Sequence, residues 1–393
     1  MFKEVFADLH IHIGAGSKGD PVKITASRKL NFENILQESL YNKGLGIIGI
    51  IDCASPVVLA DMDRLLEKGK MEELPAGGIA YGDLVIIPGV EVESREENGG
   101  QAHYLGYFPY MRNLREFSQV MAEYISNINL SSQSTGLTGK EIFQLVEAHG
   151  GIFVPAHVFT PHKSFYGRCF ETYRDLFSPE EWARIPAIEL GLSSDTYMAD
   201  CIPELADKTF ISNSDAHSLE KIAREYNLLR VKELNFKELE LALWRKEGRK
   251  VLKNFGLDPA LGKYHRSYCE NCNKRFPLEY PVLKCPVCGR EDIVVGVKDR
   301  IMEISPGKES SSPAHRGPYI HQIPLRDIPG IGEKTFRRLL DSFGTEMDII
   351  HQASEEELLE VLNYKLVERI IKARTGDLEI EDGGGGHYGK VMA

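Results

Sequence analysis

The chain has 393 residues with a formal net charge of −11, and 42% of its residues are hydrophobic, a composition typical of a globular protein with two or three domains. The negative charge argues weakly against nucleic acid as a partner, and the absence of any run of about 18 apolar residues argues against a membrane span. No basic segment followed by an apolar core opens the chain, so we predict no secretory signal and expect a cytoplasmic location.

Residues 1–255 alternate apolar runs that suit strands with stretches that suit helices. The strand candidates are 45–51, 84–88, 103–108, 152–156, 186–190 and 209–213, and the helical patterns cover 32–43, 57–68, 114–128, 139–149 and 236–247. Near-continuous Ile and Val runs with helical returns predict a parallel sheet buried on both faces. The length of this region suits a closed (β/α) barrel.

Four apolar runs end in side chains of the types that bind metals: Asp8-Leu9-His10-Ile11-His12, Pro88-Gly89-Val90-Glu91, Ala156-His157 and Asp215-Ala216-His217. The carboxyl ends of strands in a closed sheet meet at one mouth, and residues i and i+2 share a face, so His10 and His12 can bind one ion. A single His-x-His pair usually means nothing, so the prediction depends on the whole set. Imidazoles and carboxylates gathered at one mouth predict a multi-metal site that activates water against phosphate esters.

Residues 263–300 contain two Cys-x-x-Cys pairs separated by twelve residues. The chain has seven cysteines, an odd number that suits metal binding better than a disulfide framework. We predict a four-cysteine zinc site on a small ribbon, with Cys269, Cys272, Cys285 and Cys288 as ligands. Four thiolates close the coordination sphere, so the ion is expected to be structural. A redox dithiol is the alternative, and the lack of a preceding βαβ pattern disfavours it.

Residues 301–318 are rich in Ser, Pro and Gly and are predicted to form a linker. Residues 319–376 are helical and contain Ile328-Pro329-Gly330-Ile331-Gly332 ahead of a helix. This hairpin exposes backbone N–H groups at a helix N-terminus, which is a phosphate site, and nearby cations add charge without base selectivity. The predicted DNA-binding residues are Gly330, Gly332, Lys334, Arg337 and Arg338. A plain helical hairpin is the alternative.

The last segment, 377–393, contains four consecutive glycines. A glycine-rich, polar chain end with few apolar residues has little to bury. We therefore predict that this tail is disordered.

The metal-ligand phrases resemble the motifs of the PHP (polymerase and histidinol phosphatase) superfamily. The order of barrel, four-cysteine ribbon and helix-hairpin-helix resembles the endonuclease Q family in particular, as do the phrases at 21–27, 50–56, 159–164 and 189–193. The resemblance implies an α/β fold: a distorted (β/α)7 PHP barrel over 1–255, a small zinc ribbon and an all-α helix-hairpin-helix module. It also implies a DNA repair endonuclease that cleaves 5′ to deaminated bases (uracil, hypoxanthine, xanthine) or to abasic sites.

The same resemblance implies the residues of the barrel site, which holds two or three divalent ions (Zn, Mn or Mg). One ion is surrounded by His10, His12, Glu91 and Asp215. Glu91 bridges to a second ion bound by His157 and His103, and His217 is a ligand at the third site. The usual Thr-Asp-His motif is replaced here by Ile51-Asp52-Cys53, so either the third ion is absent or it uses Asp52 or Cys53. Asp8 is expected to orient a histidine from behind.

A lesion pocket is expected beside His157, because a damaged base inside a duplex must be flipped out to be read. The following segment mixes aromatic and cationic side chains that suit stacking on a base and binding a phosphate. The predicted pocket residues are Phe159, His162, Lys163, Tyr166 and Arg168, with ordinary loop packing as the alternative for each.

Three other functions share part of this pattern. A small-molecule phosphatase of the histidinol-phosphate type needs neither the ribbon nor the hairpin, and a near-complete ligand set argues against a non-catalytic DNA-binding or scaffold protein. A PHP-type DNA 3′–5′ exonuclease is the third alternative function. The expected partner is double-stranded or single-stranded DNA with a damaged base, and other repair or replication proteins are further partner candidates.

Overall fold

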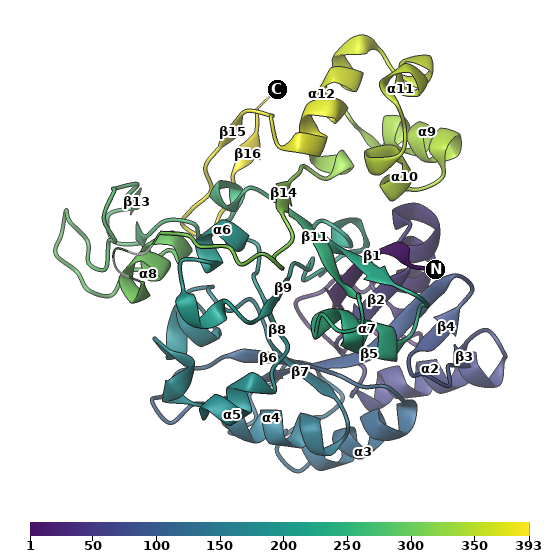
Figure 1. Ribbon diagram of the computed structural model, residues 1–393, viewed down its shortest axis with the longest axis horizontal. Coiled ribbons are helices and arrows are strands. Elements are labelled where there is room, and N and C mark those ends of the chain that lie inside the picture. The colour runs from purple at the N-terminus through teal and green to yellow at the C-terminus, as the bar shows by residue number, and fades with distance from the viewer. Residues whose placement is uncertain (306, 308, 393) are drawn as a thin grey trace.

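The computed structural model describes residues 1–305, 307 and 309–392 and centres on a curled, mixed β-sheet (Figure 1). Its main strands are β1 (Lys3–Ile11), β2 (Ile47–Ile50), β5 (Leu84–Glu93), β6 (His103–Tyr107), β7 (Ile152–Pro155), β10 (Tyr226–Val231) and β11 (Lys250–Gly256). Two short strands, β3 (Glu72–Glu73) and β4 (Ile79–Tyr81), extend the sheet beyond β5.

The strand directions differ from the wholly parallel sheet predicted above. Strands β1, β2 and β5 run parallel, as do β8 (Ala187–Glu189) and β9 (Thr209–Ile211). Strand β10 is antiparallel to both β1 and β11, and β6 is antiparallel to both β5 and β7. The prediction is wrong for β5 and β6 because the connection 94–102 is too short for the crossover that a parallel pair requires.

The β8–β9 pair completes a distorted barrel. The N–H of Val158, just after β7, donates to the Glu189 carbonyl of β8 at 3.0 Å. On the other side, the amide of Asn254 in β11 donates to the Phe210 carbonyl of β9 at 3.0 Å. The barrel interior is filled by alternate strand residues such as Leu9, and the helix α7 (Phe236–Leu243) adds apolar side chains to the same cluster.

Helices cover the outside of the sheet (Figure 1). Helix α4, for example, begins at a capping box formed by Thr138 and Glu141 and buries Ile142, Phe143 and Val146, the spacing expected for one apolar helix face. The helices of this region besides α7 are α1 (Phe32–Gln37), η1 (Glu38–Lys43), α2 (Pro56–Glu67), α3 (Met111–Met121), α4 (Gly139–Ala148), η2 (Phe165–Cys169), η3 (Tyr173–Asp175), α5 (Pro179–Ala183), α6 (Thr196–Ala199), η4 (Pro203–Leu205), η5 (Leu219–Lys221) and η6 (Pro259–Leu261).

The ribbon and linker follow the barrel with boundaries that differ from the prediction. Strands β12 (Tyr268–Cys269) and β13 (Lys274–Arg275) form the ribbon hairpin, and α8 (Val297–Ile304) crosses the predicted boundary between ribbon and linker. The described part of the linker packs on the barrel, where Arg316 forms a buried ion pair with Asp200 at 2.9 Å. Residues 306 and 308 of the predicted linker lie outside the described residues.

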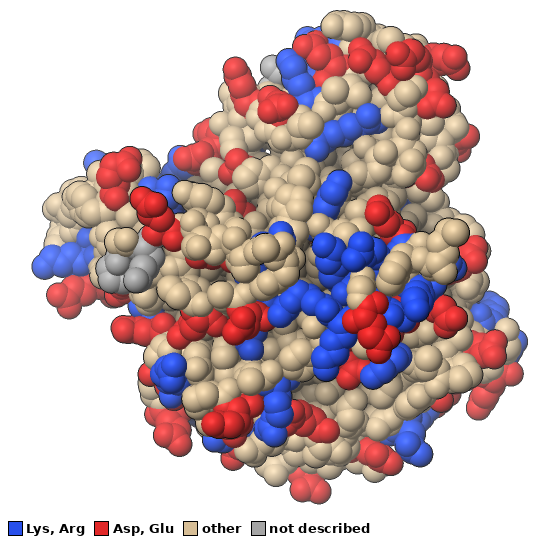
Figure 2. Space-filling model, viewed as in Figure 1, with Lys and Arg blue, Asp and Glu red and all other residues tan. Residues whose placement is uncertain are grey.

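The helical module forms a separate lobe above the barrel in Figure 1. It contains η7 (Leu325–Asp327), α9 (Glu333–Phe343), α10 (Glu346–His351), α11 (Glu355–Val361) and α12 (Tyr364–Thr375). The residues ahead of it, β14 (Tyr319–His321), instead extend the barrel sheet by pairing with β11. A buried ion pair between Lys43 and Glu346 at 2.7 Å ties the lobe to the barrel. Acidic side chains gather over this lobe (Figure 2).

The C-terminal tail is ordered, which contradicts the prediction of disorder. Strands β15 (Ile380–Glu381) and β16 (Lys390–Val391) pair as a hairpin, and Gly384, Gly385 and Gly386 have positive φ angles. The glycines thus form a tight turn that other residues adopt at a cost. Ala393 lies outside the described residues. Within the described residues, none of the helices combines the length and apolarity needed to cross a membrane.

Candidate active site

A β-bulge in β1 turns two histidines towards the mouth of the barrel. Asp8 pairs with Ile48 and Ile11 pairs with Ile50, so β1 advances three residues while β2 advances two. The extra residue inverts the alternation of the strand, as bulges near active sites commonly do. Leu9 therefore packs inside the barrel and Ile11 packs outside it. His10 and His12, which lie on either side of Ile11 in the sequence, both point into the site.

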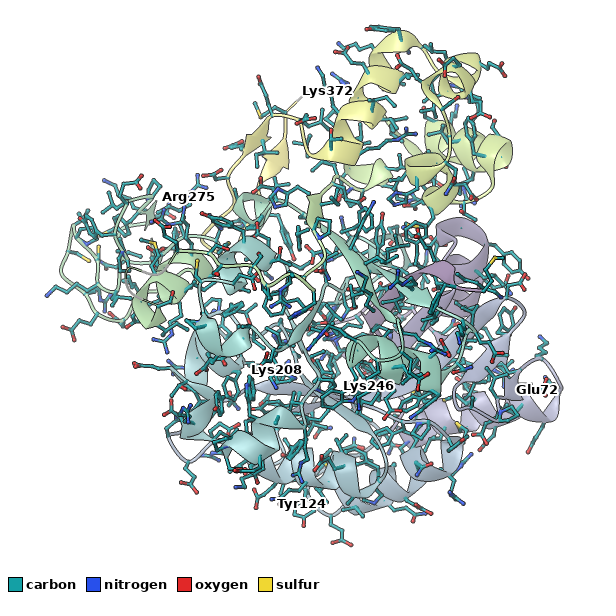
Figure 3. All side chains as sticks on the ribbon, viewed as in Figure 1. Glu72, Tyr124, Lys208, Lys246, Arg275 and Lys372 are labelled. Atoms are coloured by element: carbon teal, nitrogen blue, oxygen red, sulfur yellow. The ribbon has the colours of Figure 1, made fainter. Side chains whose placement is uncertain are left out.

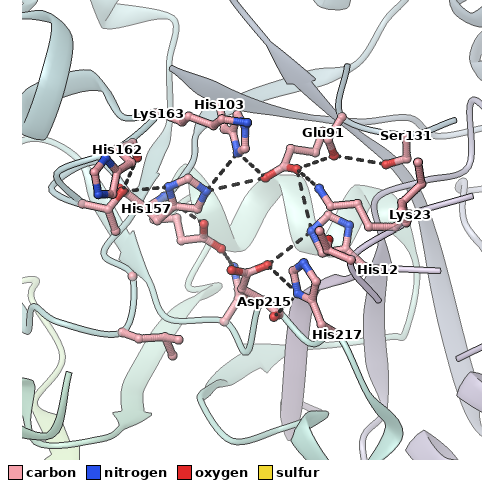
Figure 4. A pocket seen from close by; sticks show the side chains of 18 of the residues that line it. His12, Lys23, Glu91, His103, Ser131, His157, His162, Lys163, Asp215 and His217 are labelled. Atoms are coloured by element: carbon pink, nitrogen blue, oxygen red, sulfur yellow. Dashed lines mark hydrogen bonds and ion pairs between the residues drawn. The ribbon is translucent and has the colours of Figure 1, made fainter. Parts of the chain in front are cut away.

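The carboxylate of Glu91 lies at the centre of this site (Figure 4). Its Oε1 lies 3.5 Å from His10 Nε2, and its Oε2 lies 3.7 Å from His12 Nε2. On the other side, Oε1 lies 2.8 Å from His103 Nδ1 and 3.5 Å from His157 Nε2. Glu91 therefore faces two pairs of imidazoles and would be shared by ions held at each pair.

Asp215 joins the first pair of histidines to His217. Its Oδ1 lies 3.6 Å from His10 Nε2, 3.2 Å from His12 Nε2 and 3.5 Å from His217 Nδ1. Among the described residues, the side chains whose ligand atoms lie within 4.8 Å of one another form the groups His10–His12–Glu91, His12–Asp215–His217 and Glu91–His103–His157. The structure thus brings together seven of the eight barrel ligands expected from the sequence.

The eighth, Asp52, lies behind His12 and is not placed as a ligand. Its Oδ2 lies 3.1 Å from His12 Nδ1 and accepts the Ile13 N–H at 2.6 Å. A carboxylate only accepts hydrogen bonds, so Asp52 keeps the His12 proton on Nδ1 and leaves Nε2 free to bind an ion. Cys53 is buried, donates to the Ile50 carbonyl at 3.1 Å, and has a thiol pKa that burial raises. Neither replaces the missing histidine of the motif.

Glu189 holds the Nδ1 atom of His10, as Asp52 holds the Nδ1 atom of His12. The sequence analysis did not predict this role. Oε1 of Glu189 lies 3.0 Å from His10 Nδ1 and accepts from Asn213 Nδ2 at 2.7 Å, and its Oε2 accepts the His157 N–H at 2.9 Å. One available signal was that Glu189 ends an apolar run, as Glu91 does. Asp8, which was expected to orient a histidine, does so only through the backbone: it accepts the N–H of His10 at 3.3 Å, as well as the backbone N–H groups of Ser214 and Ala223.

Several features show that the site suits divalent ions. Nε2 of His10 is buried and has no hydrogen-bond partner within the described part of the chain, although its opposite nitrogen is held by Glu189. An imidazole fixed on one side and facing two carboxylates on the other has the surroundings of a metal ligand. Imidazole and carboxylate ligands accept Zn²⁺ or Mn²⁺, and carboxylates accept Mg²⁺.

The pKa values of the site reflect opposing effects of burial and charge. Burial raises the pKa of Glu91, but the charges of His103 and Lys23 outweigh it and hold that pKa well below its usual range. Burial lowers the pKa of His10, but the charge of Glu189 raises it well above its usual range. Without ions, protonated histidines thus compensate the carboxylates, and metal binding must displace those protons.

Lys23 is a second residue that sequence reasoning missed. Its Nζ lies 3.0 Å from Glu91 Oε2, on a segment, 21–27, that was noted only for its resemblance. Burial lowers the pKa of Lys23, but the charge of Glu91 raises it above its usual range. The lysine therefore places a fixed positive charge beside the central carboxylate.

Two of the ligands have strained backbone conformations. His157 has a φ of 29° and Asp215 a φ of 46°, which lie in or near the left-handed region and cost a non-glycine residue about 1 kcal/mol or more. Glu189 holds the N–H of His157 at 2.9 Å, and Arg224 Nη2 donates to the Asp215 carbonyl at 3.3 Å. Strain that is held by specific contacts is typical of functional positions.

Six of the seven candidate ligands, all except the buried His10, line a cavity of about 480 Å³ whose wall differs from the predicted lesion pocket. His162 and Lys163 line the cavity as expected. Phe159 and Tyr166 are instead buried in the core, where Tyr166 donates to Glu204 at 2.7 Å. Arg168 is exposed and does not line the cavity. The segment coils into η2, and burial of its large aromatic rings in the core outweighs their exposure in a pocket.

The missed residues of that wall are Lys263, Tyr264 and Tyr388. Lys263 and Tyr264 lie just after η6, and Tyr388 belongs to the tail that was predicted to be disordered. No local pattern in the sequence connects them to the ligands at the strand ends.

The four cysteines of the ribbon also converge. Cys269 Sγ lies 3.8 Å from Cys288 Sγ, and Cys272 Sγ lies 3.8 Å from Cys285 Sγ. Thiolates at ~2.3 Å from a tetrahedral zinc ion are about 3.8 Å apart. The ribbon therefore has the geometry of a structural zinc site.

The predicted DNA-binding hairpin precedes α9. Gly330 has a φ of 94° and Gly332 caps the helix, and a Cβ at Gly332 would meet no atom of the described chain within 4 Å. Lys334 and Arg338 are exposed beside it. Arg337 is less available than expected, because its Nε donates to Glu333 at 2.9 Å.

Known proteins resemble this chain over almost its full length. YqxK of Bacillus subtilis (strain 168), described as uncharacterized, is 43% identical over 391 residues, which are 99% of this chain and 99% of that protein. A family model described as a SAM-like helix-hairpin-helix tandem matches residues 323–374.

Two solved structures show the same similarity. The lesion-specific endonuclease PfuEndoQ from Pyrococcus furiosus has a TM-score of 0.83 and 31% identity, and the match covers 99% of this chain and 95% of that one. A structure of endonuclease Q in complex with a 27-mer duplex substrate that has an abasic lesion at the active site also has a TM-score of 0.83 and 31% identity, with 99% of this chain and 96% of that one covered.

Proposed function

Since the chain belongs to the endonuclease Q family of metal-dependent DNA endonucleases, we propose that it cleaves DNA on the 5′ side of a damaged nucleotide. The proposed lesions are abasic sites and the deaminated bases uracil, hypoxanthine and xanthine. The similar protein that was crystallised with an abasic duplex supports the first of these. The proposal for deaminated bases rests on the resemblance of the sequence motifs.

The observation that carries this proposal is the convergence of ligands around Glu91. Side chains from the end of β1, from β5 and β6, and from the loops after β7 and β9 converge at one cavity, although they are far apart in the sequence. Two ions would be held on either side of Glu91, one by His10, His12 and Asp215 and the other by His103 and His157. We further propose that a third ion, where present, uses His217.

When bound, such ions lower the pKa of water and stabilise the charge that develops on a phosphate. The chain itself prepares the ligands. Glu189 and Asp52 hold protons on the Nδ1 atoms of His10 and His12, which keeps both Nε2 atoms directed towards Glu91 and Asp215. Asn213 donates to Glu189 at 2.7 Å and so prevents that carboxylate from rotating. Lys23 offsets the negative charge of Glu91 where an anionic phosphate must approach.

The helical lobe is proposed to bind the DNA backbone. The exposed backbone at Gly330 and Gly332 and the cation of Lys334 can contact phosphates without reading the bases. This division leaves recognition of the lesion to the cavity.

A duplex with one defined lesion tests the proposal. We expect a single internal nick 5′ to the lesion, with a 3′-hydroxyl and a 5′-phosphate, on end-labelled strands resolved by gel electrophoresis. Asp215→Asn should abolish nicking while DNA binding, measured by fluorescence anisotropy, persists. A ladder of shortened products would favour a 3′–5′ exonuclease, and hydrolysis of p-nitrophenyl phosphate without nicking would favour a phosphatase.

A further inference from the structure

The C-terminal hairpin forms part of the wall of the active-site cavity. Tyr388 lines the cavity together with Lys263 and Tyr264. In Figure 1 the hairpin strands β15 and β16 lie between the ribbon and the helical lobe. A residue of this hairpin is thus part of the cavity wall.

Backbone hydrogen bonds hold the hairpin against the loop that carries the other two wall residues. The N–H of Gly389, next to Tyr388, donates to the Leu261 carbonyl at 2.9 Å, and the N–H of Gly386 donates to the Lys263 carbonyl at 3.2 Å. Arg275 of the ribbon points towards the hairpin (Figure 3) and donates to the Gly383 carbonyl at 2.9 Å. The position of Tyr388 is therefore supported from the barrel and from the ribbon.

Arg224 connects Tyr388 directly to a metal ligand. Its Nη1 donates to the Tyr388 hydroxyl at 3.3 Å, and its Nη2 donates to the Asp215 carbonyl at 3.3 Å. One guanidinium group thus separates the tyrosine hydroxyl from the loop that holds the catalytic carboxylate. A nucleotide with its phosphate at the ligands would occupy the same cavity that Tyr388 lines.

The surroundings of Tyr388 suit an aromatic ligand. The Arg224 guanidinium carbon lies 5.8 Å from its ring centroid, but the residue is still 43% exposed, so part of the ring is free to be covered. The Lys263 ammonium lies 5.5 Å from its ring centroid and 5.2 Å from that of Tyr264. His162 packs edge-on against Tyr264 at 5.3 Å, which leaves Tyr388 as the more available of the two rings.

We propose that Tyr388 is a specificity-determining residue whose ring stacks on the base of a lesion nucleotide that is flipped into the cavity. This inference rests on the proposed function and extends it to the choice among lesions. Every base has an aromatic face that can stack on tyrosine, whereas an abasic site has no base to stack. Tyr388 should therefore contribute more to the cleavage of uracil-containing DNA than to the cleavage of abasic DNA.

Single-turnover nicking of two duplexes tests this inference. The duplexes are identical except that one position holds uracil or an abasic analogue, and the full-length, metal-loaded protein is used. We expect Tyr388→Ala to lower the ratio of the uracil rate to the abasic rate by about fivefold or more, the lower end of what loss of one stacked base produces. Tyr388→Phe keeps the ring and should retain most of the ratio.

Tyr280→Ala is the matched control, because Tyr280 is an exposed tyrosine of the ribbon that does not line the cavity. It should leave both rates unchanged. An equal loss on both duplexes in Tyr388→Ala, an unchanged ratio, or faster cleavage of both would overturn the stacking role. A wild-type protein that nicks neither duplex would overturn the proposed function itself, and this inference with it.

Discussion

Replacing Glu189 with Gln tests how the barrel prepares its metal ligands. Glu189 is 1% exposed and receives three hydrogen bonds, from the His10 ring, the His157 backbone and the Asn213 amide. Burial raises its pKa, but the charge of His10 outweighs burial and keeps the carboxyl ionised. Gln has nearly the same shape, so the substitution changes charge and hydrogen bonding while it leaves the packing in place.

The expected magnitude follows from those contacts. All three partners donate to Glu189, and a Gln amide can accept on one side only, so at least one buried donor faces an NH2 group. Loss of a hydrogen bond to a charged group costs about 1.5–3 kcal/mol. Loss of a carboxylate behind a metal-binding histidine typically lowers metal affinity or activity by about 10- to 100-fold. We expect a loss of metal affinity in that range for Glu189→Gln.

The assay measures ions retained after dialysis, by elemental analysis, together with nicking as a function of Mn²⁺ concentration. The control is Glu225→Gln, because burial raises the pKa of Glu225 to about 8. That carboxyl is already neutral at pH 7, so its replacement by a neutral amide should change little. The reasoning fails if Glu189→Gln retains its ions and titrates with Mn²⁺ like the wild type.

Further outcomes are expected from the ribbon, the lobe and the ions. Cys272→Ser should remove one structural zinc per chain, measured by elemental analysis, and should expose the ribbon to limited proteolysis. Burial lowers the pKa of His351 from 6.5 to about 4. Its protonation therefore favours the unfolded state: stability is full above pH 6.5 and falls as pH decreases towards 4, by about 2 kcal/mol at pH 5. Urea unfolding at pH 7 and pH 5 should show this loss, and His351→Asn should reduce it. Gly330→Ala should weaken both folding and DNA binding, because its Cβ would lie 2.8 Å from Leu366 Cδ2 at a φ of 94°. Gly332→Ala meets no neighbouring atom of the described chain and should keep the fold, as a thermal melt would show. Chelation should abolish nicking, and added Mn²⁺ should restore it.

The sequence by itself determined the parts of this protein that local patterns encode. Apolar runs that end in His, Glu or Asp predicted candidate ligands that do converge in the structure, because the chemistry of metal binding limits which residues can serve. The family resemblance and the fold class are confirmed by the similarity to solved endonuclease Q structures. The spacing of the four cysteines predicted a ribbon whose sulfur atoms do converge.

Only the tertiary structure decided which side chains support the candidate ligands through hydrogen bonds and ion pairs, and which side chains complete the cavity wall. The β1 bulge that directs His10 and His12 inwards is a property of strand pairing, and Glu189 and Lys23 reach the site through packing between distant segments. Phe159 and Tyr166 do not line the cavity as predicted, because burying large rings in the core is favourable. Tyr388 lines the cavity because the glycine turn folds this segment back onto the barrel. Such long-range contacts depend on how the whole chain closes, which local patterns do not encode.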